Sequence, residues 1–269
     1  MDLDLRKLRY FVAVAEHRNF GRAAQALYIT QPVLSRQIKA FEQELQCTLL
    51  VRSTRSVELT AAGERLHEEA RTILAAVSTA VRRVHDVERG VQRLAVAFSP
   101  GLRVSEAVRA FTVRHPDVEI DLVPAVWWEQ DTPLRDGRAQ VGYLRRPFDD
   151  TGLRTVPIGR EPRVACMPTA HRLAGRAELT AADLDGEHII DTPRRRTASL
   201  EEKFEHVAAG SDIALVPLSV ARSYSRPDLV HIPVTDVPGA DTCLAALAGR
   251  RPRLVRDFLE IATLTLRDA

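Results

Sequence analysis

The chain has 269 residues, 45% of them hydrophobic and 28% charged, and its formal net charge is +2. This length suits two medium-sized domains with separate cores, and the total charge gives no sign of a nucleic-acid partner. The three cysteines are far apart, which argues against a disulfide framework and favours a reducing compartment. No apolar run approaches the roughly 18 residues of a membrane span or forms a signal peptide. We therefore expect a cytoplasmic protein that has no membrane partner.

Positive charge is concentrated at the front of the chain. Residues 1–60 hold nine Lys or Arg against six Asp or Glu, a balance of +3. Residues 61–90 hold five of each kind, and the remainder holds 24 basic against 25 acidic residues. This small excess at the N-terminus is what a DNA-binding head needs.

Three helical patterns fill the first 45 residues. Apolar residues recur at threes and fours over 5–17 and again over 19–27. A three-residue joint that begins at Tyr28 leads into a third helix, with Thr30 as its N-cap and Pro32 in its first turn. Two short helices connected by such a joint are the signature of a helix-turn-helix.

The third helix has two unlike faces. Its apolar stripe, spaced four, three and four residues apart, consists of Leu34, Ile38, Phe41 and Leu45. Its opposite face carries hydrogen-bonding groups and consists of Gln31, Pro32, Ser35, Arg36, Lys39 and Gln43. An ordinary amphipathic surface helix shows the same division, so the neighbouring elements must decide between a surface helix and one that contacts DNA.

Residues 47–60 predict a two-stranded wing, with apolar runs at 49–51 and 57–59 on either side of a basic tip. Thr60 then caps a helix of about 28 residues, roughly 40 Å long. Its narrow apolar seam consists of Leu66, Ala70, Ile73, Val77, Val81, Val84 and Val87. One helix cannot bury such a seam alone, so we expect it to pair with a second copy and to end at Gly90.

From Leu94 onward, short apolar runs alternate with helical patterns. The strand candidates are RLAVAFS, VEIDLVP, AQVGYL, RVACMP, EHIID, IALVP and CLAAL. The helix candidates are VSEAVRAFTVRHP and the closing segment RPRLVRDFLEIATLTL. This alternation predicts an α/β domain with mostly parallel sheets, in which ligands bind at the carboxyl ends of the strands.

Local motifs of catalysis and metal binding are absent from the sequence, including GxGxxG, the Walker loop, HExxH and GxSxG. We therefore predict no catalytic residue, no metal, no cofactor and no enzymatic activity. Cys166 fits either a redox switch or a buried strand cysteine, and the second is favoured because an activated thiolate needs an exposed electropositive site. The basic run at 193–197 fits an anion site or, more simply, a solvated loop.

Taken in order, these elements closely resemble a LysR-type transcriptional regulator. The resemblance covers essentially the whole chain and is dense over residues 5–66, through RYFVAVAEHRNFGRAAQALYITQPVLSRQIKAFEQEL and LTAAGERL. It is thinner afterwards and rests on DGRAQVGYL and VAAGSDIALVPLSVA. The resemblance implies an N-terminal all-α winged helix-turn-helix, a long linker helix and a C-terminal α/β domain made of two periplasmic-binding-protein-like lobes.

The resemblance also implies a homodimer joined through its linker helices, often assembled as a homotetramer. We expect a DNA-binding domain over 1–60, a dimerisation helix over 61–90 and an effector-binding domain over 91–269. The lobes of the last domain are expected at about 91–160 with 236–269, and at about 161–235. The second lobe looks shortened, because only RRRTA stands where the family has a further helix and strand.

The resemblance places the polar face of the third helix in the major groove of double-stranded DNA. Arg36 suits guanine O6 and N7, and Gln31 suits adenine or a phosphate. On the wing, Arg52 and Arg55 suit the DNA backbone or the minor groove, with plain surface charge as the alternative for Arg55. The full set of expected DNA-binding residues is Arg22, Thr30, Gln31, Pro32, Ser35, Arg36, Lys39, Arg52, Thr54 and Arg55.

Family analogy also places an effector between the two lobes. The expected rim is Ser99, Pro100, Trp127, Trp128, Arg145, Asp191 and Thr192. Arg145 would anchor a carboxylate and the tryptophans would form a flat wall, which favours a small anionic aromatic effector. Paired tryptophans also fit a core or a dimer interface. Because the second lobe is short, we expect either no tight effector or a cleft that the partner subunit closes.

These expectations combine into a bacterial regulator that binds a two-fold operator, responds to a small molecule and, if it activates, contacts RNA polymerase. The alternative is a ligand-independent regulator whose shortened effector domain serves only oligomerisation. A third hypothesis makes residues 91–269 a solute-binding or catalytic module, and the missing signal peptide and motifs argue against it. One departure in the head is Gln46, which stands where the family usually turns on glycine.

Overall fold

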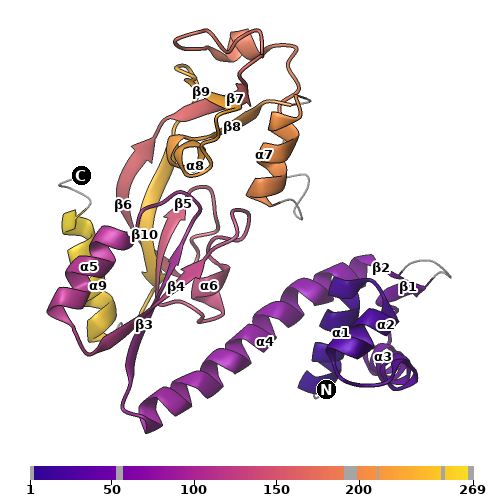
Figure 1. The fold of residues 1–269 in the computed structure, drawn as a ribbon. Helices are drawn as coiled ribbons and strands as arrows, with labels where there is room; N and C mark the ends of the chain where they lie inside the picture. Colours follow the sequence, from indigo (N-terminus) through magenta and orange to yellow (C-terminus); the bar gives the residue numbers. More distant parts are fainter. Residues whose placement is uncertain (1–2, 53–56, 191–198, 211, 250–251, 266–269) are drawn as a thin grey trace. The chain divides into compact units, whose positions relative to one another are not determined.

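A computed structural model describes residues 3–52, 57–190, 199–210, 212–249 and 252–265 (Figure 1). The chain divides into two compact units, Met1–His85 and Asp86–Ala269. Each unit has its own buried apolar clusters and is described separately below.

The N-terminal unit begins with α1 (Leu5–His17), α2 (Phe20–Ala26) and α3 (Gln31–Leu45). Each begins after an N-cap residue with extended or near-extended backbone, and Asp4 and Asn19 accept backbone hydrogen bonds that cap α1 and α2. The predicted stripe of α3 is buried at Leu34, Ile38 and Phe41, and Leu45 is half-buried against the same core. Phe41 meets Phe11 of α1 with ring centroids 6.4 Å apart. Helical periodicity therefore places these three helices around one core.

A small antiparallel wing follows, with β1 (Leu50–Arg52) paired to β2 (Val57–Leu59). Gln46 makes the turn out of α3 with φ 53° and ψ 31°, and its N–H bonds the carbonyls of Gln43 and Glu42. The left-handed turn is therefore kept although the residue is not glycine. The Glu42 carboxylate also accepts hydrogen bonds from the N–H groups of Leu49 and Leu50, at 2.9 and 3.1 Å. These contacts tie the start of the wing to α3.

The long helix α4 (Ala61–Glu88) has 28 residues and starts after Thr60, whose hydroxyl accepts from the N–H of Gly63 at 3.0 Å. Its apolar seam has two halves with different surroundings. Leu66, Ala70 and Ile73 belong to the core of the N-terminal unit. Farther along, the side chains are exposed, by 51% at Val81, 67% at Val84 and 81% at Val87. Among the described residues, the first half of the seam is thus covered by the N-terminal unit, and Val81, Val84 and Val87 are not covered.

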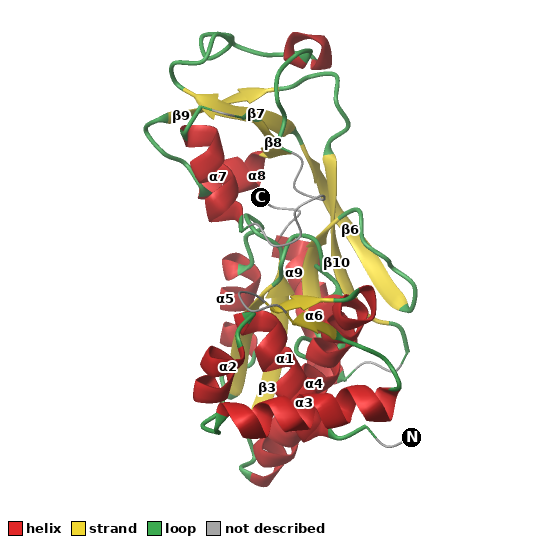
Figure 2. Cartoon of the chain, turned by 90° about the vertical axis from the view of Figure 1, so that its right-hand side faces the viewer, coloured by secondary structure: helices red, strands yellow, loops and turns green. Residues whose placement is uncertain are grey.

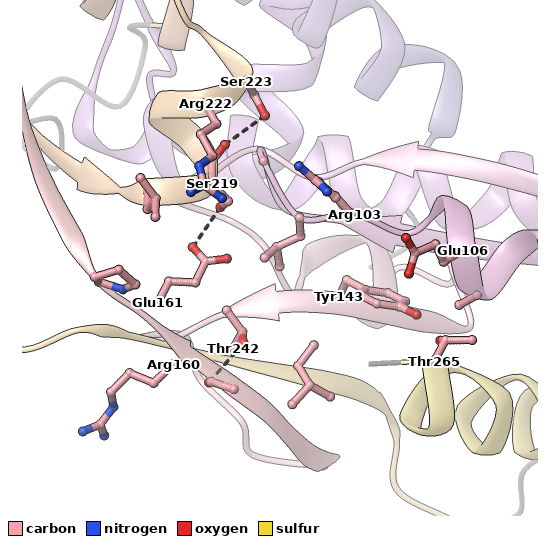
Figure 3. Close-up of a pocket in the computed structure, with 17 residues that line it drawn as sticks. Arg103, Glu106, Tyr143, Arg160, Glu161, Ser219, Arg222, Ser223, Thr242 and Thr265 are labelled. Atoms are coloured by element: carbon pink, nitrogen blue, oxygen red, sulfur yellow. Dashed lines mark hydrogen bonds between the residues drawn. The ribbon is translucent and has the colours of Figure 1, made fainter. Parts of the chain in front are cut away.

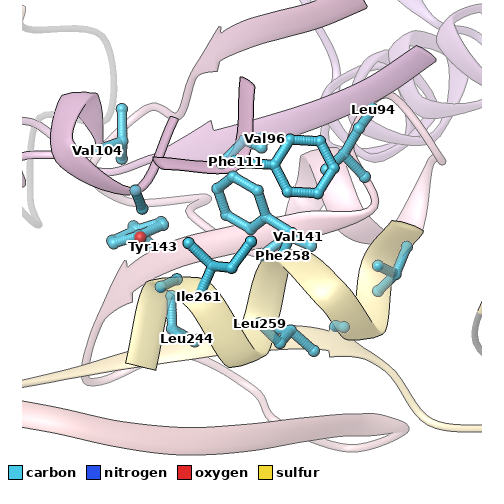
Figure 4. Packing of buried hydrophobic residues seen from close by; sticks show 14 of the residues in the cluster. Leu94, Val96, Val104, Phe111, Val141, Tyr143, Leu244, Phe258, Leu259 and Ile261 are labelled. Carbon is cyan, nitrogen blue, oxygen red and sulfur yellow. The ribbon is translucent and has the colours of Figure 1, made fainter. Parts of the chain in front are cut away.

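The larger sheet of the C-terminal unit has the strand order β4-β3-β5-β10-β6. These strands are β3 (Gln92–Phe98), β4 (Val118–Pro124), β5 (Val141–Arg145), β6 (Leu153–Glu161) and β10 (Ala240–Leu247). The β3–β4 and β3–β5 pairs are parallel, whereas β10 is antiparallel to both of its neighbours. The helices α5 (Ser105–Arg114) and α9 (Arg253–Thr265) bury their apolar faces against this sheet (Figure 4). The short α6 (Thr132–Arg135) contributes to a cluster with β5 and β10.

The smaller sheet has the order β8-β7-β9 and is antiparallel throughout. Its strands are β7 (Arg163–Pro168), β8 (Ala214–Pro217) and β9 (Leu229–Pro233). The helices α7 (Leu200–Ala208) and α8 (Leu218–Ser223) pack on it, as Figure 2 shows, and a 3-10 turn η1 covers Ala181–Leu184. β6 and β10 are long strands that run from the larger sheet toward the smaller one (Figure 2).

Two expectations about these sheets were wrong. Among the strands that the structure describes, parallel ladders join only β4, β3 and β5, because β10 returns from a distant part of the sequence and runs antiparallel between β5 and β6. Of the predicted strand at 187–191, the described residues 187–190 form an isolated bridge between Ile189 and Ile213, and Asp191 lies outside the described residues. β6 and β9 were not predicted at all.

Candidate nucleic-acid interface and ligand cavity

The outer face of α3 presents polar groups to solvent. Gln31, Pro32, Arg36 and Lys39 are exposed, and Ser35 is half-buried. Arg36 and Lys39 form no ion pair or side-chain hydrogen bond with another described residue. Their cationic groups are therefore available to an anionic or acceptor-rich partner.

The first turn of α3 has backbone N–H groups that no side chain caps. Thr30 occupies the N-cap position with extended backbone, but its side chain makes no capping hydrogen bond, and Pro32 lies in the first turn. A helix N-terminus with unused N–H groups attracts anions such as phosphate. The Thr30 hydroxyl, which is exposed, lies beside these groups.

Arg22 has a different environment from the α3 residues. Its guanidinium donates to the carbonyl oxygen of His17 at 2.9 Å, and its backbone N–H donates to the Asn19 side chain at 2.9 Å. Arg22 thus ties α2 to the end of α1 while part of its guanidinium stays exposed. On the wing, Thr54, Arg55 and the side chain of Arg52 lie outside the described residues.

Ser99 and Pro100, expected on the effector rim, follow β3. The Ser99 side chain is fully buried, and its hydroxyl hydrogen-bonds the Gln130 side-chain oxygen. That oxygen also accepts from the backbone N–H of Arg145 at 2.7 Å. Through the Gln130 side chain, the Ser99 hydroxyl therefore links the end of β3 to the end of β5.

Arg145 is buried and has several partners. Its guanidinium donates to Glu161 at 3.1 Å, to the Ser219 hydroxyl at 2.9 Å and to the Pro100 carbonyl at 3.1 Å. Burial lowers the pKa of Arg145, and the neighbouring Glu161 carboxylate opposes this shift. The expected carboxylate anchor is thus already paired with Glu161, and of its nitrogen atoms Nε has no hydrogen-bond partner among the described residues.

The two tryptophans of the expected rim lie against each other. Trp127 and Trp128 meet edge to face with centroids 5.4 Å apart, and Trp127 packs against the core of the smaller sheet. Trp128 is half-buried, and the assignment of the tryptophan pair to an effector rim stays a prediction. Asp191 and Thr192, like the basic run 193–197, lie outside the described residues.

A cavity of about 530 Å³ lies beside this network (Figure 3). Its lining comes from the loop before α5, α5 itself, β5, β6, α8, β10 and α9. The lining side chains with polar groups are Arg103, Glu106, Tyr143, Arg160, Glu161, Ser219, Arg222, Ser223, Thr242 and Thr265. None of the seven residues expected on the effector rim is among those that line it.

This cavity could not be predicted from the sequence, for a physical reason. Tyr143 lies in the buried run VGYL, where an aromatic residue is expected to fill the core. Arg103 and Arg222 lie 119 positions apart in the sequence, so only the tertiary fold brings them to one cavity. No local pattern could have indicated it.

Other chemical sites are not evident in the part of the chain that the structure describes. Those residues contain no group of three or more His, Cys, Asp or Glu that could hold a metal ion, and no helix long and apolar enough to cross a membrane. Cys166 is fully buried in β7, and burial raises the pKa of its thiol to about 12. The thiol is therefore protonated at neutral pH, as a structural cysteine would be.

Two family models match the chain. Residues 5–64 match the bacterial regulatory helix-turn-helix protein of the lysR family, and residues 85–197 match the LysR substrate binding domain. The Hca operon transcriptional activator HcaR of Escherichia coli (strain K12) is 35% identical over 233 residues, which cover 86% of this chain and 75% of the relative. The chain belongs to the LysR family. It is a DNA-binding transcriptional regulator.

Other LysR relatives match over nearly the whole chain. The regulator BudR of Raoultella terrigena is 31% identical over 293 aligned residues, covering 96% of this chain and all of the relative. The crystal structure of the LysR family regulator CbnR has a TM-score of 0.65 at 24% identity, covering 98% of this chain and 99% of that one. Full-length CbnR complexed with its target DNA gives a TM-score of 0.60 at 25% identity, covering 98% and 100%. The whole fold, including the expected winged head, linker helix and two-lobed α/β domain, is therefore that of a LysR regulator.

Proposed function

We propose that this LysR regulator binds a two-fold operator as a dimer or tetramer, with α3 of each subunit in the major groove. Residues 1–60 supply DNA contacts, 61–90 supply the dimer contact and 91–269 carry regulation. The observation that supports the first assignment most is the exposed face of α3, where Arg36 and Lys39 have no partner among the described residues.

The chemistry of that face suggests a role for each group. Arg36 can give two parallel hydrogen bonds to guanine O6 and N7, and Gln31 can pair with adenine. Thr30, Ser35 and Lys39 suit phosphates, which position the helix without selecting sequence. Arg22, Pro32, Arg52, Thr54 and Arg55 complete the proposed interface.

The exposed half of the α4 seam supports self-association. Val81, Val84 and Val87 lie at helical spacing with most of their surface in solvent. A second copy of α4 would remove these side chains from water and would place two heads on one operator. Association through this seam makes the two-fold operator a consequence of the dimer's own symmetry.

A small-molecule effector would bind the C-terminal unit and change DNA binding, and if the protein activates transcription it also contacts RNA polymerase. A specific observation favours the alternative of a ligand-independent regulator, since Arg145 on the expected rim is already paired with Glu161. A cavity elsewhere in the same unit supports the sensor instead. A shift of the DNA footprint on adding ligand would separate the two.

The DNA proposal is tested with an operator selected by the full-length protein from random sequence. Arg36→Ala should lose about 1–3 kcal/mol of binding free energy on that operator and relax the preference at one base pair per half-site. Lys39→Ala should weaken binding to all sequences equally and reduce the salt slope by about 1. Arg71→Ala, an exposed arginine on α4, is the charge-matched control. The α3 assignment fails if Arg36→Ala binds the selected operator as tightly as the control.

A further inference from the structure

The cavity of the C-terminal unit lies between the larger sheet with its helices and α8, the helix that packs on the smaller sheet. Arg103, Glu106 and Tyr143 come from elements of the larger sheet, and Ser219 and Arg222 come from α8, which packs on the smaller one. Its volume of about 530 Å³ falls within the roughly 300–1,000 Å³ of typical small-molecule sites. A ligand in the cavity would therefore contact both the larger sheet and α8.

At one edge of the cavity, the loop before α5 lies close to the backbone of α8. Gly101 has φ +82°, and a Cβ at this position would lie 2.7 Å from the carbonyl carbon of Ser219. Only glycine fits both this backbone conformation and this contact. The approach fixes the loop before α5 against the start of α8, so the cavity has a defined wall.

Tyr143 supplies a polar group in need of a partner. The side chain is 1% exposed, and among the described residues its hydroxyl has no hydrogen-bond partner. Figure 3 shows the ring in the cavity, with the hydroxyl directed toward the side where Glu106 and Thr265 lie. A buried hydroxyl without a hydrogen-bond partner lowers the stability of the fold. A ligand that hydrogen-bonds the Tyr143 hydroxyl would remove this cost and would explain why the hydroxyl is there.

The charges around the cavity are not balanced. Glu161 is paired with Arg145, and Arg160 is paired with Asp241. Arg103 and Arg222 have no ion pair or side-chain hydrogen bond with any described residue, and neither does Glu106. Two unpaired guanidinium groups against one carboxylate leave a positive excess, which attracts an anion.

The rest of the lining is apolar and comes mainly from Leu102, Ala107, Ile158 and Leu218. A ligand that suits the cavity thus needs a compact apolar body in addition to an anionic group. Its second polar group should be able to hydrogen-bond both a phenol and a carboxylate, as a hydroxyl can.

We propose that this cavity is the effector site of the regulator and that it binds a small hydroxylated carboxylic acid. Arg103 and Arg222 hold the carboxylate, and Tyr143 with Glu106 holds the hydroxyl group. This inference rests on the proposed function, because it assumes that the C-terminal unit regulates DNA binding.

This site differs from the rim that family analogy indicated. It needs neither Arg145 as an anchor nor the tryptophan pair as a wall. The residues that line it also lie outside the shortened stretch of the second lobe, at 101–107, 143, 158–162, 218–223, 242 and 265. A short second lobe is therefore compatible with a sensor.

The experiment is calorimetry of the full-length protein with 4-hydroxybenzoate, 3-hydroxybenzoate and benzoate. We expect at least one hydroxybenzoate to bind, and Arg222→Ala and Arg103→Ala each to weaken it about tenfold or more, as loss of a charge-assisted hydrogen bond does. Arg109→Ala, an exposed arginine on α5 that does not line the cavity, should bind like the wild type. The inference is overturned if no hydroxybenzoate binds at millimolar concentration, or if the cavity variants and the control bind equally.

Tyr143→Phe gives a second, independent measurement. The hydroxybenzoate should bind about fivefold or more weakly to this variant, and benzoate should bind it as it binds the wild type. The melting temperature without ligand should stay the same or rise, because the variant removes an unpaired buried hydroxyl. A fall in that melting temperature would show that the hydroxyl has a structural partner and would overturn its assignment to the ligand.

Measuring DNA binding in the absence of ligand distinguishes a failure of the cavity proposal from a failure of the proposed function. A wild-type protein that selects an operator but ignores all three acids contradicts only the cavity site. A wild-type protein that selects no operator contradicts the proposed function, whatever the calorimetry shows.

Discussion

Arg145 and Glu161 form a hydrogen-bonded ion pair at 3.1 Å, and the Ser219 hydroxyl lies between them, accepting from the arginine and donating to the carboxylate at 2.8 Å. Arg145 ends β5 of the larger sheet, and Ser219 belongs to α8 of the smaller one. Because Arg145 is buried, this triad is a structural connection within the C-terminal unit and not an open anion site.

We expect Arg145→Met to lower the free energy of unfolding by about 3 kcal/mol, because it leaves the partly buried carboxylate of Glu161 without its counter-ion. The double variant Arg145→Met with Glu161→Gln should recover part of this loss. Urea unfolding of the two single variants and the double variant measures the coupling. If the losses of unfolding free energy in the two single variants simply add up in the double variant, the interaction between Arg145 and Glu161 does not stabilise the fold.

Local patterns were sufficient to predict the N-terminal unit. The periodicity over residues 5–17 matches α1 at both ends, and the predicted stripe of α3 is buried at Leu34, Ile38 and Phe41. Both results depend on residues three or four positions apart, which a helix brings together without help from the rest of the chain. The seam of α4 is a partial exception, since its first half serves the core of the unit.

The sheets of the C-terminal unit could not be predicted in the same way. β6 contains Pro157 and Gly159, which weaken a strand pattern, and its pairing with β10 has a register shift next to Thr242. The strand exists because β10, about 80 residues later in the sequence, pairs with it. The cavity depends on the same long-range pairing, and so its lining residues show no local signal.

Gly63 provides a sharp test of the N-terminal unit. A Cβ at this position would lie 2.1 Å from the carbonyl oxygen of Leu49, which is backbone and cannot rotate away. We expect Gly63→Ala to destabilise the unit by about 3 kcal/mol or more, with loss of DNA binding. Thermal unfolding should show this, while Gly175→Ala, whose Cβ meets nothing within 4 Å, should unfold like the wild type. Equal stability of the two variants would contradict the close approach.

A substitution at Gln46 should raise the free energy of unfolding of the N-terminal unit, whereas the substitution at Gly63 should lower it. Its φ of 53° is left-handed, a conformation that costs a residue with a Cβ roughly 1–2 kcal/mol, whereas glycine adopts it freely. After the larger backbone entropy of glycine in the unfolded chain is subtracted, Gln46→Gly should stabilise the unit by about 0.5–1 kcal/mol. Gln43→Gly, inside α3, is the matched control and should destabilise it by about 1 kcal/mol. Denaturant unfolding that gives the same sign for both variants would be inconsistent with a strained turn.

His231 predicts a pH dependence of stability. Burial lowers the pKa of this imidazole from its ordinary value of 6.5, and its Nε2 atom has no partner among the described residues. The unfolded chain therefore binds a proton at a higher pH than the folded chain does. Neutral His231 makes its full contribution to the free energy of unfolding above pH 6.5. This contribution is lost as the pH falls from 6.5 through the lowered pKa of the folded state. His231→Gln should flatten this acid side of the stability profile, and an unchanged slope would rule out the assignment.

The exposed half of the α4 seam gives the last prediction. Full burial of a valine stabilises by roughly 1.5–3 kcal/mol, so two copies of Val81 and Val84 can contribute several kcal/mol to association. An aspartate at each of these positions would bring four like charges into the seam, and we expect Val81→Asp with Val84→Asp to weaken the dimer about 100-fold or more. Light scattering at micromolar concentration should show a dimer or tetramer for the wild type and a smaller species for this variant.

DNA affinity should fall with the dimer, because two linked heads bind one operator far more tightly than one head. The control is Val113→Asp on α5, which is 85% exposed and adds the same kind of charge outside the seam. It should keep both the assembly and the DNA affinity of the wild type. A monomeric wild type, or a seam variant that stays assembled, would mean that another surface joins the subunits and that the exposed valines have a different role.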